Sequence, residues 1–139
     1  MLDNIGWEPF DFEYRLPTRT EWELVANGGY SNRQKKMLRK QNKKHDGKYR
    51  TCNMVYNYQK QLENTSLTMI APSRTYIPNK FQIFNIYGNV AEMVSEPHVA
   101  MGGSFLDRYE EIVPTNKAVS YEGAERWLGF RCVAEIYDK

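Results

Sequence analysis

The stretch FNIYGNVAEM, Phe84 to Met93, combines residue types that can organise oxygen atoms around a cation. It places a glycine, two asparagines and the carboxylate of Glu92 within an otherwise apolar run. Calcium takes about six to eight hard oxygen ligands in a loose geometry, and glycine lets a chain wrap so that main-chain carbonyls converge. The stretch therefore predicts a turn around a cation. The alternative is a tight turn in which Glu92 is solvated or pairs with a base such as Arg131.

A second polar group lies in GGSFLDRYEE, where Asp107, Glu110 and Glu111 flank Arg108. Such a group could serve acid–base chemistry in a cleft. Three acids and one arginine in a loop are, however, commonly just solvated. The sequence offers no pairing of a base with a nucleophile here, because Ser104 has no histidine predictably near it.

Histidines and cysteines are scarce, which limits metal and thiol chemistry. His45 and His98 are the two histidines of the chain, so an iron site of two histidines and a carboxylate is not expected. Cys52 and Cys132 are too few for a disulfide scaffold, and neither lies in a C-x-x-C motif. They are either buried thiols or a pair, and the spacing leaves both readings open.

Length and charge narrow the class of protein. The chain has 139 residues, which predicts one domain, and no apolar run is long enough for a transmembrane segment. Eight basic residues against one acid give the window 33–48 a charge of +7, while the chain as a whole carries +2. This basic run has no interleaved aromatic residues on which bases could stack, and the other residues are acidic on balance. We therefore expect a solvated surface and no nucleic-acid partner.

One helix is predicted sharply from its ends. In RLPTRTEWELVANGG, Thr18 and Glu21 have the spacing of a capping box. The helix is expected to run from about Arg19 to Ala26, with Trp22 on its apolar face, and to stop at Asn-Gly-Gly. A further short exposed helix is expected around Met37-Leu38, and 49–73 is expected to be loop.

Strands are predicted near the end of the chain. MGGSF, Met101 to Phe105, is expected to be a short strand in which glycine allows close backbone approach. In WLGFRCVAEI, apolar residues at every second position from Leu128 to Ile136 predict one strand with a single apolar face. Without a repeat or a strand–helix alternation, the expected class is α+β, with much irregular structure and short antiparallel strands.

Four motifs in order resemble one family. RLPTRTEWELVANGG, PNKFQIFNIYGNVAEMV, MGGSF and WLGFRCV are similar to segments of the formylglycine-generating-enzyme (sulfatase-modifying factor) family, whose fold is a variant of the C-type lectin fold. The resemblance covers roughly Tyr14 to Val133 and implies one such domain over residues 1–139. GNVAEM and WLGFRC look most like members from Bacteroidetes-type bacteria, in which related domains occur in gliding-motility and secretion lipoproteins. A cell-envelope or periplasmic location is implied by this resemblance alone.

The resemblance also shows what this chain lacks. Oxidising members of the family carry a C-x4-C pair after the GGS motif that binds copper, and the matching positions here are Asp107 and Ile112. Neither side chain can replace a thiolate that holds Cu(I), so formylglycine-generating oxidation and copper are not expected. The resemblance thus favours a non-catalytic binding or scaffold domain with a protein or glycan ligand. The alternative is a divergent enzyme that uses Asp107, Arg108 and Glu110.

For the opening stretch, the resemblance implies a structural calcium ion. The family's ligand positions fall on Asn85, Gly88, Val90 and Glu92, of which Gly88 and Val90 would give main-chain carbonyls. A second family calcium site would use Asn53 and Met54 with a downstream acid. Thr65 stands where that acid is expected, and Glu63 is close to it.

Two further consequences concern assembly and crosslinking. Family domains normally begin well upstream of RLPT, so the domain is expected to be N-terminally incomplete. An uncovered sheet edge invites pairing, which suggests a homo-oligomer or a completing partner strand. Some members also pair the GFRC cysteine with one in the preceding helix. Here Cys132 keeps its place but Ala26 stands at the other position, so that bridge is not expected.

Overall fold

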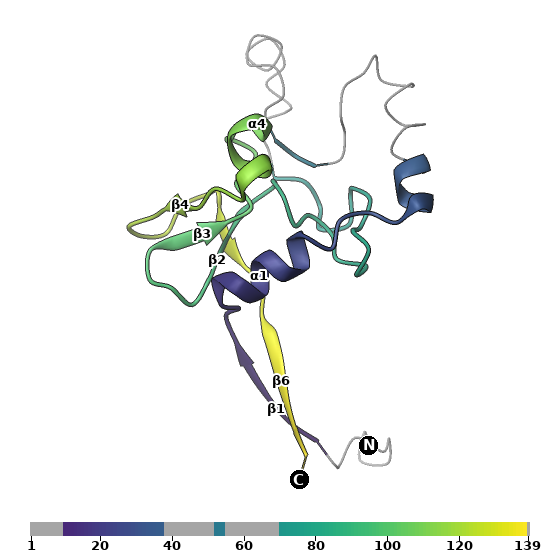
Figure 1. The fold of residues 1–139 in the computed structure, drawn as a ribbon. Coiled ribbons are helices and arrows are strands. Elements are labelled where there is room, and N and C mark those ends of the chain that lie inside the picture. The colour runs from purple at the N-terminus through teal and green to yellow at the C-terminus, as the bar shows by residue number, and fades with distance from the viewer. Residues whose placement is uncertain (1–9, 38–51, 55–69, 139) are drawn as a thin grey trace.

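The computed structural model describes residues 10–37, 52–54 and 70–138 (Figure 1). Its short helices and strands are of the α+β class predicted from the sequence, and the described stretch 70–90 is irregular. No helix among the described residues is long and apolar enough to cross a membrane. In chain order the elements are β1 (Phe10–Arg15), α1 (Arg19–Ala26), β2 (Ala91–Met93), β3 (Val99–Met101), α4 (Tyr109–Ile112), the 3-10 helix η2 (Val113–Thr115), β4 (Val119–Ser120), β5 (Leu128–Phe130) and β6 (Val133–Asp138).

Local chemistry determines both ends of α1. The Oγ1 of Thr18 accepts a hydrogen bond from the N–H of Glu21 at 3.1 Å, and the Glu21 carboxylate accepts one from the N–H of Thr18 at 2.7 Å. At the other end the N–H of Asn27 donates to the carbonyl of Glu23, and Gly29 adopts a φ of +62°. The predicted capping box, the bounds of this helix and its Asn-Gly-Gly stop are confirmed.

The core lies between α1 and a four-stranded sheet. The strand order is β4-β3-β2-β5, with β2 antiparallel to β3 and parallel to β5. The indole of Trp22 is 2% exposed and meets the Tyr87 ring edge-on, with the centroids 5.8 Å apart. The main core consists of Trp22, Ala26, Ile86, Val94 and Met101, and a second cluster consists of Cys52, Met54 and Ile112.

The strand predicted over Met101–Phe105 is wrong beyond its first residue. β3 ends at Met101, because Gly102 and Gly103 adopt φ angles of +86° and +65°, which no strand residue uses. A Cβ on Gly102 would lie 2.5 Å from the carbonyl oxygen of Ile86. The close backbone approach that was predicted for these glycines is therefore present, but in a turn.

The C-terminal segment forms two strands instead of the single strand predicted. β5 pairs with β2, whereas β6 pairs antiparallel with β1 as a separate two-stranded ribbon. The predicted alternation of apolar residues is present, but its apolar face is exposed. Phe130 is 64% exposed and Ile136 is 60% exposed, and the small side chains between them also face solvent.

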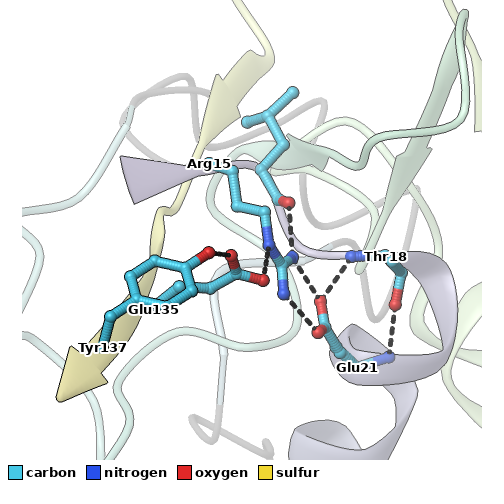
Figure 2. Close-up of polar contacts among 6 residues, drawn as sticks. Arg15, Thr18, Glu21, Glu135 and Tyr137 are labelled. Carbon is cyan, nitrogen blue, oxygen red and sulfur yellow. Dashed lines mark hydrogen bonds and ion pairs between the residues drawn. The ribbon is translucent and has the colours of Figure 1, made fainter. Parts of the chain in front are cut away.

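A network of ion pairs on the opposite face of the β1–β6 ribbon explains why the apolar face is exposed. The ribbon extends away from the four-stranded sheet (Figure 1). The Nε of Arg15 donates to Glu135 across the ribbon at 2.8 Å, and its two terminal nitrogens donate to Glu21 of α1 at 2.7 and 2.8 Å (Figure 2). The charged face is thereby tied to α1, so the apolar face points outward.

The basic segment and the loop that follows it are described only in part. Residues 32–37 are helical, and Met37 is 46% exposed, in agreement with the exposed helix predicted there. Leu38, most of the basic run and most of the loop predicted over 49–73 lie outside the described residues.

Candidate functional site

The backbone of the stretch 84–92 wraps tightly, as its composition predicted. Asn85, Gly88 and Asn89 all have positive φ, at 52°, 74° and 67°. The N–H of Gly88 donates to the carbonyl of Gly102 at 2.8 Å, and a Cβ on Gly88 would lie 2.6 Å from the carbonyl oxygen of Asn53. Only glycine fits at position 88, because any side chain would collide with this neighbouring backbone.

The four predicted ligand residues come together at one pocket of about 410 Å³. Its lining includes all four, Asn85, Gly88, Val90 and Glu92, together with Ser73, Arg74, Phe130 and Arg131. The convergence of these four residues, spread over eight positions of the chain, is the arrangement that a shared ligand would require.

Asn85 carries an unusual buried oxygen, and the residue lines both this pocket and a neighbouring one. Its Nδ2 donates to the carbonyl of Ser73 at 2.8 Å, but its Oδ1 is buried and accepts no hydrogen bond from the described part of the chain. An unpaired buried carbonyl oxygen costs about 1–3 kcal/mol. Its residue also has the left-handed backbone that asparagine tolerates better than most side chains. This oxygen fits a cation or a hydrogen-bond donor.

Glu92 is held by protein groups. Its side chain is 6% exposed and pairs with Arg131, whose Nη2 donates to Oε1 at 2.7 Å and whose Nε donates to both carboxylate oxygens at 3.2 Å. The indole N–H of Trp22 donates to Oε2 at 3.1 Å. The pairing with Arg131 that the sequence left open is confirmed. A carboxylate offers about four acceptor positions, so a cation could use Glu92 only by sharing it with Arg131.

The second predicted calcium site is described only at its first two residues. The Nδ2 of Asn53 donates to the Oδ1 of Asn89 at 3.2 Å, and Met54 is buried against Ile112. Glu63 and Thr65 lie outside the described residues. Among the residues that the structure describes, no group of three His, Cys, Asp or Glu is placed to hold a metal.

The positions of the family's cysteines have structural roles here. Asp107 Oδ2 accepts hydrogen bonds from the N–H of Ser104 at 2.7 Å and from its Oγ at 3.0 Å, which closes the turn after the glycines. Ile112 is 3% exposed in the second core cluster. Arg108 lies 3.8 Å from Glu111 in an exposed ion pair one helical turn away.

The other candidate residues are dispersed. No disulfide joins Cys52 and Cys132, so the reading in which they pair is wrong. Of the two thiols expected to be buried, Cys52 is buried and Cys132 is exposed. His98 hydrogen-bonds through Nδ1 to the carbonyl of Tyr121 at 2.9 Å. His45 lies outside the described residues.

Sequence reasoning missed the role of Asn89. Its Oδ1 accepts from the N–H of Ala71 at 2.7 Å and its Nδ2 donates to the carbonyl of Ala71 at 3.1 Å. It therefore fixes residue 71 and Asn53 against the turn at Gly88. The only local signal was an asparagine directly after a turn glycine, which does not identify partners 18 and 36 residues away.

A second pocket of about 270 Å³ lies beside the first and is lined by tyrosines. Burial raises the pKa of Tyr30 and of Tyr87 to about 12 in each case. The hydroxyl of Tyr87 donates to Asn116. Both phenols therefore stay protonated at neutral pH, and neither can serve as a base there.

Similarity to known proteins identifies the fold and the family of this chain. The chain is similar to the crystal structure of CarF with a TM-score of 0.58 and 22% identity, over 90% of this chain and 48% of that one. It thus spans about half the length of that chain, and the likeness, at this identity, concerns the fold. No curated protein matches the sequence. The sequence model of the sulfatase-modifying factor enzyme 1-like domain matches residues 4–136. The predicted fold, a formylglycine-generating-enzyme variant of the C-type lectin fold, is confirmed, and the chain belongs to the sulfatase-modifying factor family.

Proposed function

We propose that this chain is a non-catalytic binding or scaffold domain of its family, acting at a bacterial cell envelope on a protein or glycan ligand. The proposal rests on the two residues that stand where oxidising members of the family carry their copper-binding cysteines. Asp107 is engaged with Ser104 inside a turn, and Ile112 is packed in the core. A Cu(I) site needs soft ligands, and these positions offer a bound carboxylate and a hydrocarbon.

The alternative of a divergent enzyme has less support. Its candidate residues are Asp107, Arg108 and Glu110, and the first two are engaged in local contacts. Glu110 is exposed. His98 lies in an exposed turn, where its Nδ1 hydrogen-bonds to the carbonyl of Tyr121, and His45 lies outside the described residues. A general base must lie within hydrogen-bond reach of the proton that it takes.

A copper assay tests the proposal. The purified protein is given Cu(I) and, under air, a peptide that carries a sulfatase cysteine motif. We expect no formylglycine in the peptide by mass spectrometry, because no thiolate pair holds the metal. The matched variant carries both Asp107→Cys and Ile112→Cys, which should raise the affinity for Cu(I) at least tenfold. A melting curve of the variant checks that it folds.

Two outcomes would contradict the proposal. One is formylglycine formation by the wild-type protein. The other is any turnover that falls tenfold or more in Asp107→Asn while the melting temperature stays unchanged. Asparagine keeps a carbonyl oxygen that can accept from Ser104, so a change confined to activity would assign chemistry to the carboxylate.

We further propose a structural calcium ion at the pocket of Asn85, Gly88, Val90 and Glu92. The free Oδ1 of Asn85 supports the proposal, as does the convergence of all four residues on one pocket. Asn85 would give its side-chain oxygen, Gly88 and Val90 main-chain carbonyls, and Glu92 the negative charge shared with Arg131. A bound ion would satisfy the buried oxygen and fix the wrapped loop.

Thermal melting with excess chelator and then with millimolar calcium tests this site. An ion at 100 times its dissociation constant adds about 2.7 kcal/mol to the free energy of unfolding, which is several degrees in Tm for a domain of this size. Asn85→Gly should abolish the shift, since it tolerates the positive φ but removes the oxygen. Asn116→Gly is the matched control, because Asn116 also has positive φ, at 49°, and does not line this pocket.

The experiment distinguishes a calcium ion bound through Asn85 from an Asn85 that has only a structural role. A calcium shift that persists in Asn85→Gly, or no shift at tens of millimolar calcium, would contradict the proposed site. Glu92→Ala is a poor probe, because it also breaks the pair with Arg131 and the bond from Trp22.

A further inference from the structure

The pocket of about 410 Å³ carries a surplus of positive charge. Arg74 and Arg131 both line it, and Glu92 is the one carboxylate among its described lining residues. Both oxygens of Glu92 are already engaged, by the guanidinium of Arg131 and by the indole N–H of Trp22. Glu92 therefore balances the charge of Arg131, and no described carboxylate in the pocket balances that of Arg74.

Arg131 has two N–H groups to spare. A guanidinium carries five N–H groups. The Nε and Nη2 of Arg131 donate to Glu92, and Nη2 also donates to the carbonyl of Phe84 at 2.7 Å. Nη1 donates to no described group, and it is not one of the buried unpaired atoms, so it reaches solvent. The pair with Glu92 thus holds the guanidinium in place and leaves its outer nitrogen available to a ligand.

Arg74 brings the second cationic group to the pocket. It is exposed, in a turn where the N–H of Thr75 donates to the carbonyl of Pro72, and it forms no ion pair with a described residue. The Nδ2 of Asn85 donates to the carbonyl of Ser73 and thereby ties this turn to the pocket. One exposed arginine is ordinary, but two that line one concave pocket attract an anion. The planar guanidinium fits carboxylate oxygens especially well.

The rest of the lining favours a sugar ring over a peptide. Ser73 and Gln82 are exposed, and their side chains make no hydrogen bond to the described part of the chain, so both are available to hydroxyl groups. Phe130 is 64% exposed and offers a flat apolar ring to the C–H face of a sugar. A peptide would seek main-chain partners, but the N–H groups of Gly88 and Asn89 already donate to neighbouring carbonyls.

We propose that this pocket binds a sugar acid, whose carboxylate pairs with Arg74 and with Nη1 of Arg131 and whose ring packs on Phe130. The proposal rests on the proposed binding function and deepens it by naming the chemical class of the ligand. It makes no use of the buried Oδ1 of Asn85, so it does not require the calcium ion. The pocket volume is near the small end for ligand sites, which suits one or two sugar rings.

An NMR titration of the ¹⁵N-labelled full chain with D-glucuronate, in excess chelator, tests the proposal. The amides of Val90 and Phe130 and the Nε–H of Arg131 should shift, with a dissociation constant on the order of 1 mM, because one charged group at an open site binds weakly. D-Glucuronamide has the same ring without the charge, and acetate has the charge without the ring. Each should bind at least tenfold more weakly than glucuronate.

Two variants assign the contacts. Arg74→Gln should weaken the binding of glucuronate at least fivefold. Arg126→Gln is the matched control, because Arg126 is also exposed, loses the same charge and does not line the pocket. Phe130→Ala should weaken glucuronate at least threefold and leave acetate unchanged. Its control is Phe12→Ala, since Phe12 is 45% exposed and does not line the pocket.

The outcomes separate this site from the proposed function. No shift up to about 50 mM glucuronate, or equal weakening by Arg74→Gln and Arg126→Gln, would overturn the proposal. Equal affinity for acetate and glucuronate would overturn the sugar acid and leave a general anion site. These failures do not touch the non-catalytic function, because a different ligand would still serve a binding domain. Chemical conversion of bound glucuronate, followed in its own proton spectrum, would support the site and contradict the non-catalytic function.

Discussion

Two arginine–carboxylate clusters hold this molecule together, and they differ in where they lie. Arg131 and Glu92 meet at the core, with the indole of Trp22 as a further donor. Arg15 joins Glu21 and Glu135 where the ribbon meets α1 (Figure 2). The shortest contacts are equal, at 2.7 Å in both clusters. The contact distances therefore do not show which cluster contributes more to the free energy of unfolding.

Burial separates the two clusters. The two arginines are similarly exposed, Arg131 at 34% and Arg15 at 33%, but the side chain of Glu92 is 6% exposed whereas those of Glu21 and Glu135 are 39% and 37% exposed. A carboxylate without water depends on its protein partners, so removing a partner leaves an uncompensated polar group. An exposed ion pair can replace lost partners by water and contributes little. The buried cluster should therefore determine stability, and the exposed one should determine how the ribbon is attached.

The largest effect is expected from Glu92→Ala. It leaves the Trp22 N–H without its acceptor and takes the carboxylate from Arg131, which keeps the carbonyl of Phe84. We expect a loss on the order of 3 kcal/mol in the free energy of unfolding. Urea unfolding measures it. Glu122→Ala is the control, because Glu122 is exposed, and it should change stability by less than about 0.5 kcal/mol. A loss for Glu92→Ala no larger than this control would contradict the comparison.

How the two clusters form could be predicted only in part. Thr18 and Glu21 were assigned correctly because a capping box needs partners only three residues apart. The contact of Arg15 with Glu135 depends on the pairing of β1 with β6, and these two residues lie 120 positions apart. No local pattern specifies that contact.

The same limit explains the errors at the C-terminus and in the site. Alternation from Leu128 to Ile136 indicated extended backbone, but which face is buried depends on what packs against it, and here α1 contacts the charged side. For the candidate cation site, the turn at Gly88 followed from composition. The contact of Asn85 with Ser73 required the assembled fold, whereas the sequence had already suggested the pair of Glu92 with Arg131 as one alternative.

A smaller effect is expected from Arg15→Ala. It removes one link between the ribbon and α1, yet Glu21 and Glu135 can then be solvated where they stand. We expect less than about a third of the stability loss of Glu92→Ala in the same urea experiment. Amide hydrogen exchange should rise more in β1 and β6 than in β2 and β3, since only the ribbon loses an attachment. Equal protection loss in both sheets would mean that the exposed cluster supports the core as well.

The smallest effect is expected from Glu21→Gln, and it should depend on pH. Hydrogen bonds from Arg15 and from Thr18 lower the pKa of Glu21 to about 2, from 4.5 in the unfolded chain. The carboxylate therefore stabilises the folded state above about pH 4.5, and this contribution is lost as the pH falls through about 2. Glutamine keeps the capping box but cannot titrate. The Tm of the wild type should fall more steeply than that of Glu21→Gln between pH 5 and about 2.5. Glu135 also has a lowered pKa, through Tyr137 and Arg15, so Glu135→Gln should remove a separate part of the slope. Parallel curves for the wild type and Glu21→Gln would show that Arg15 does not hold Glu21 in solution.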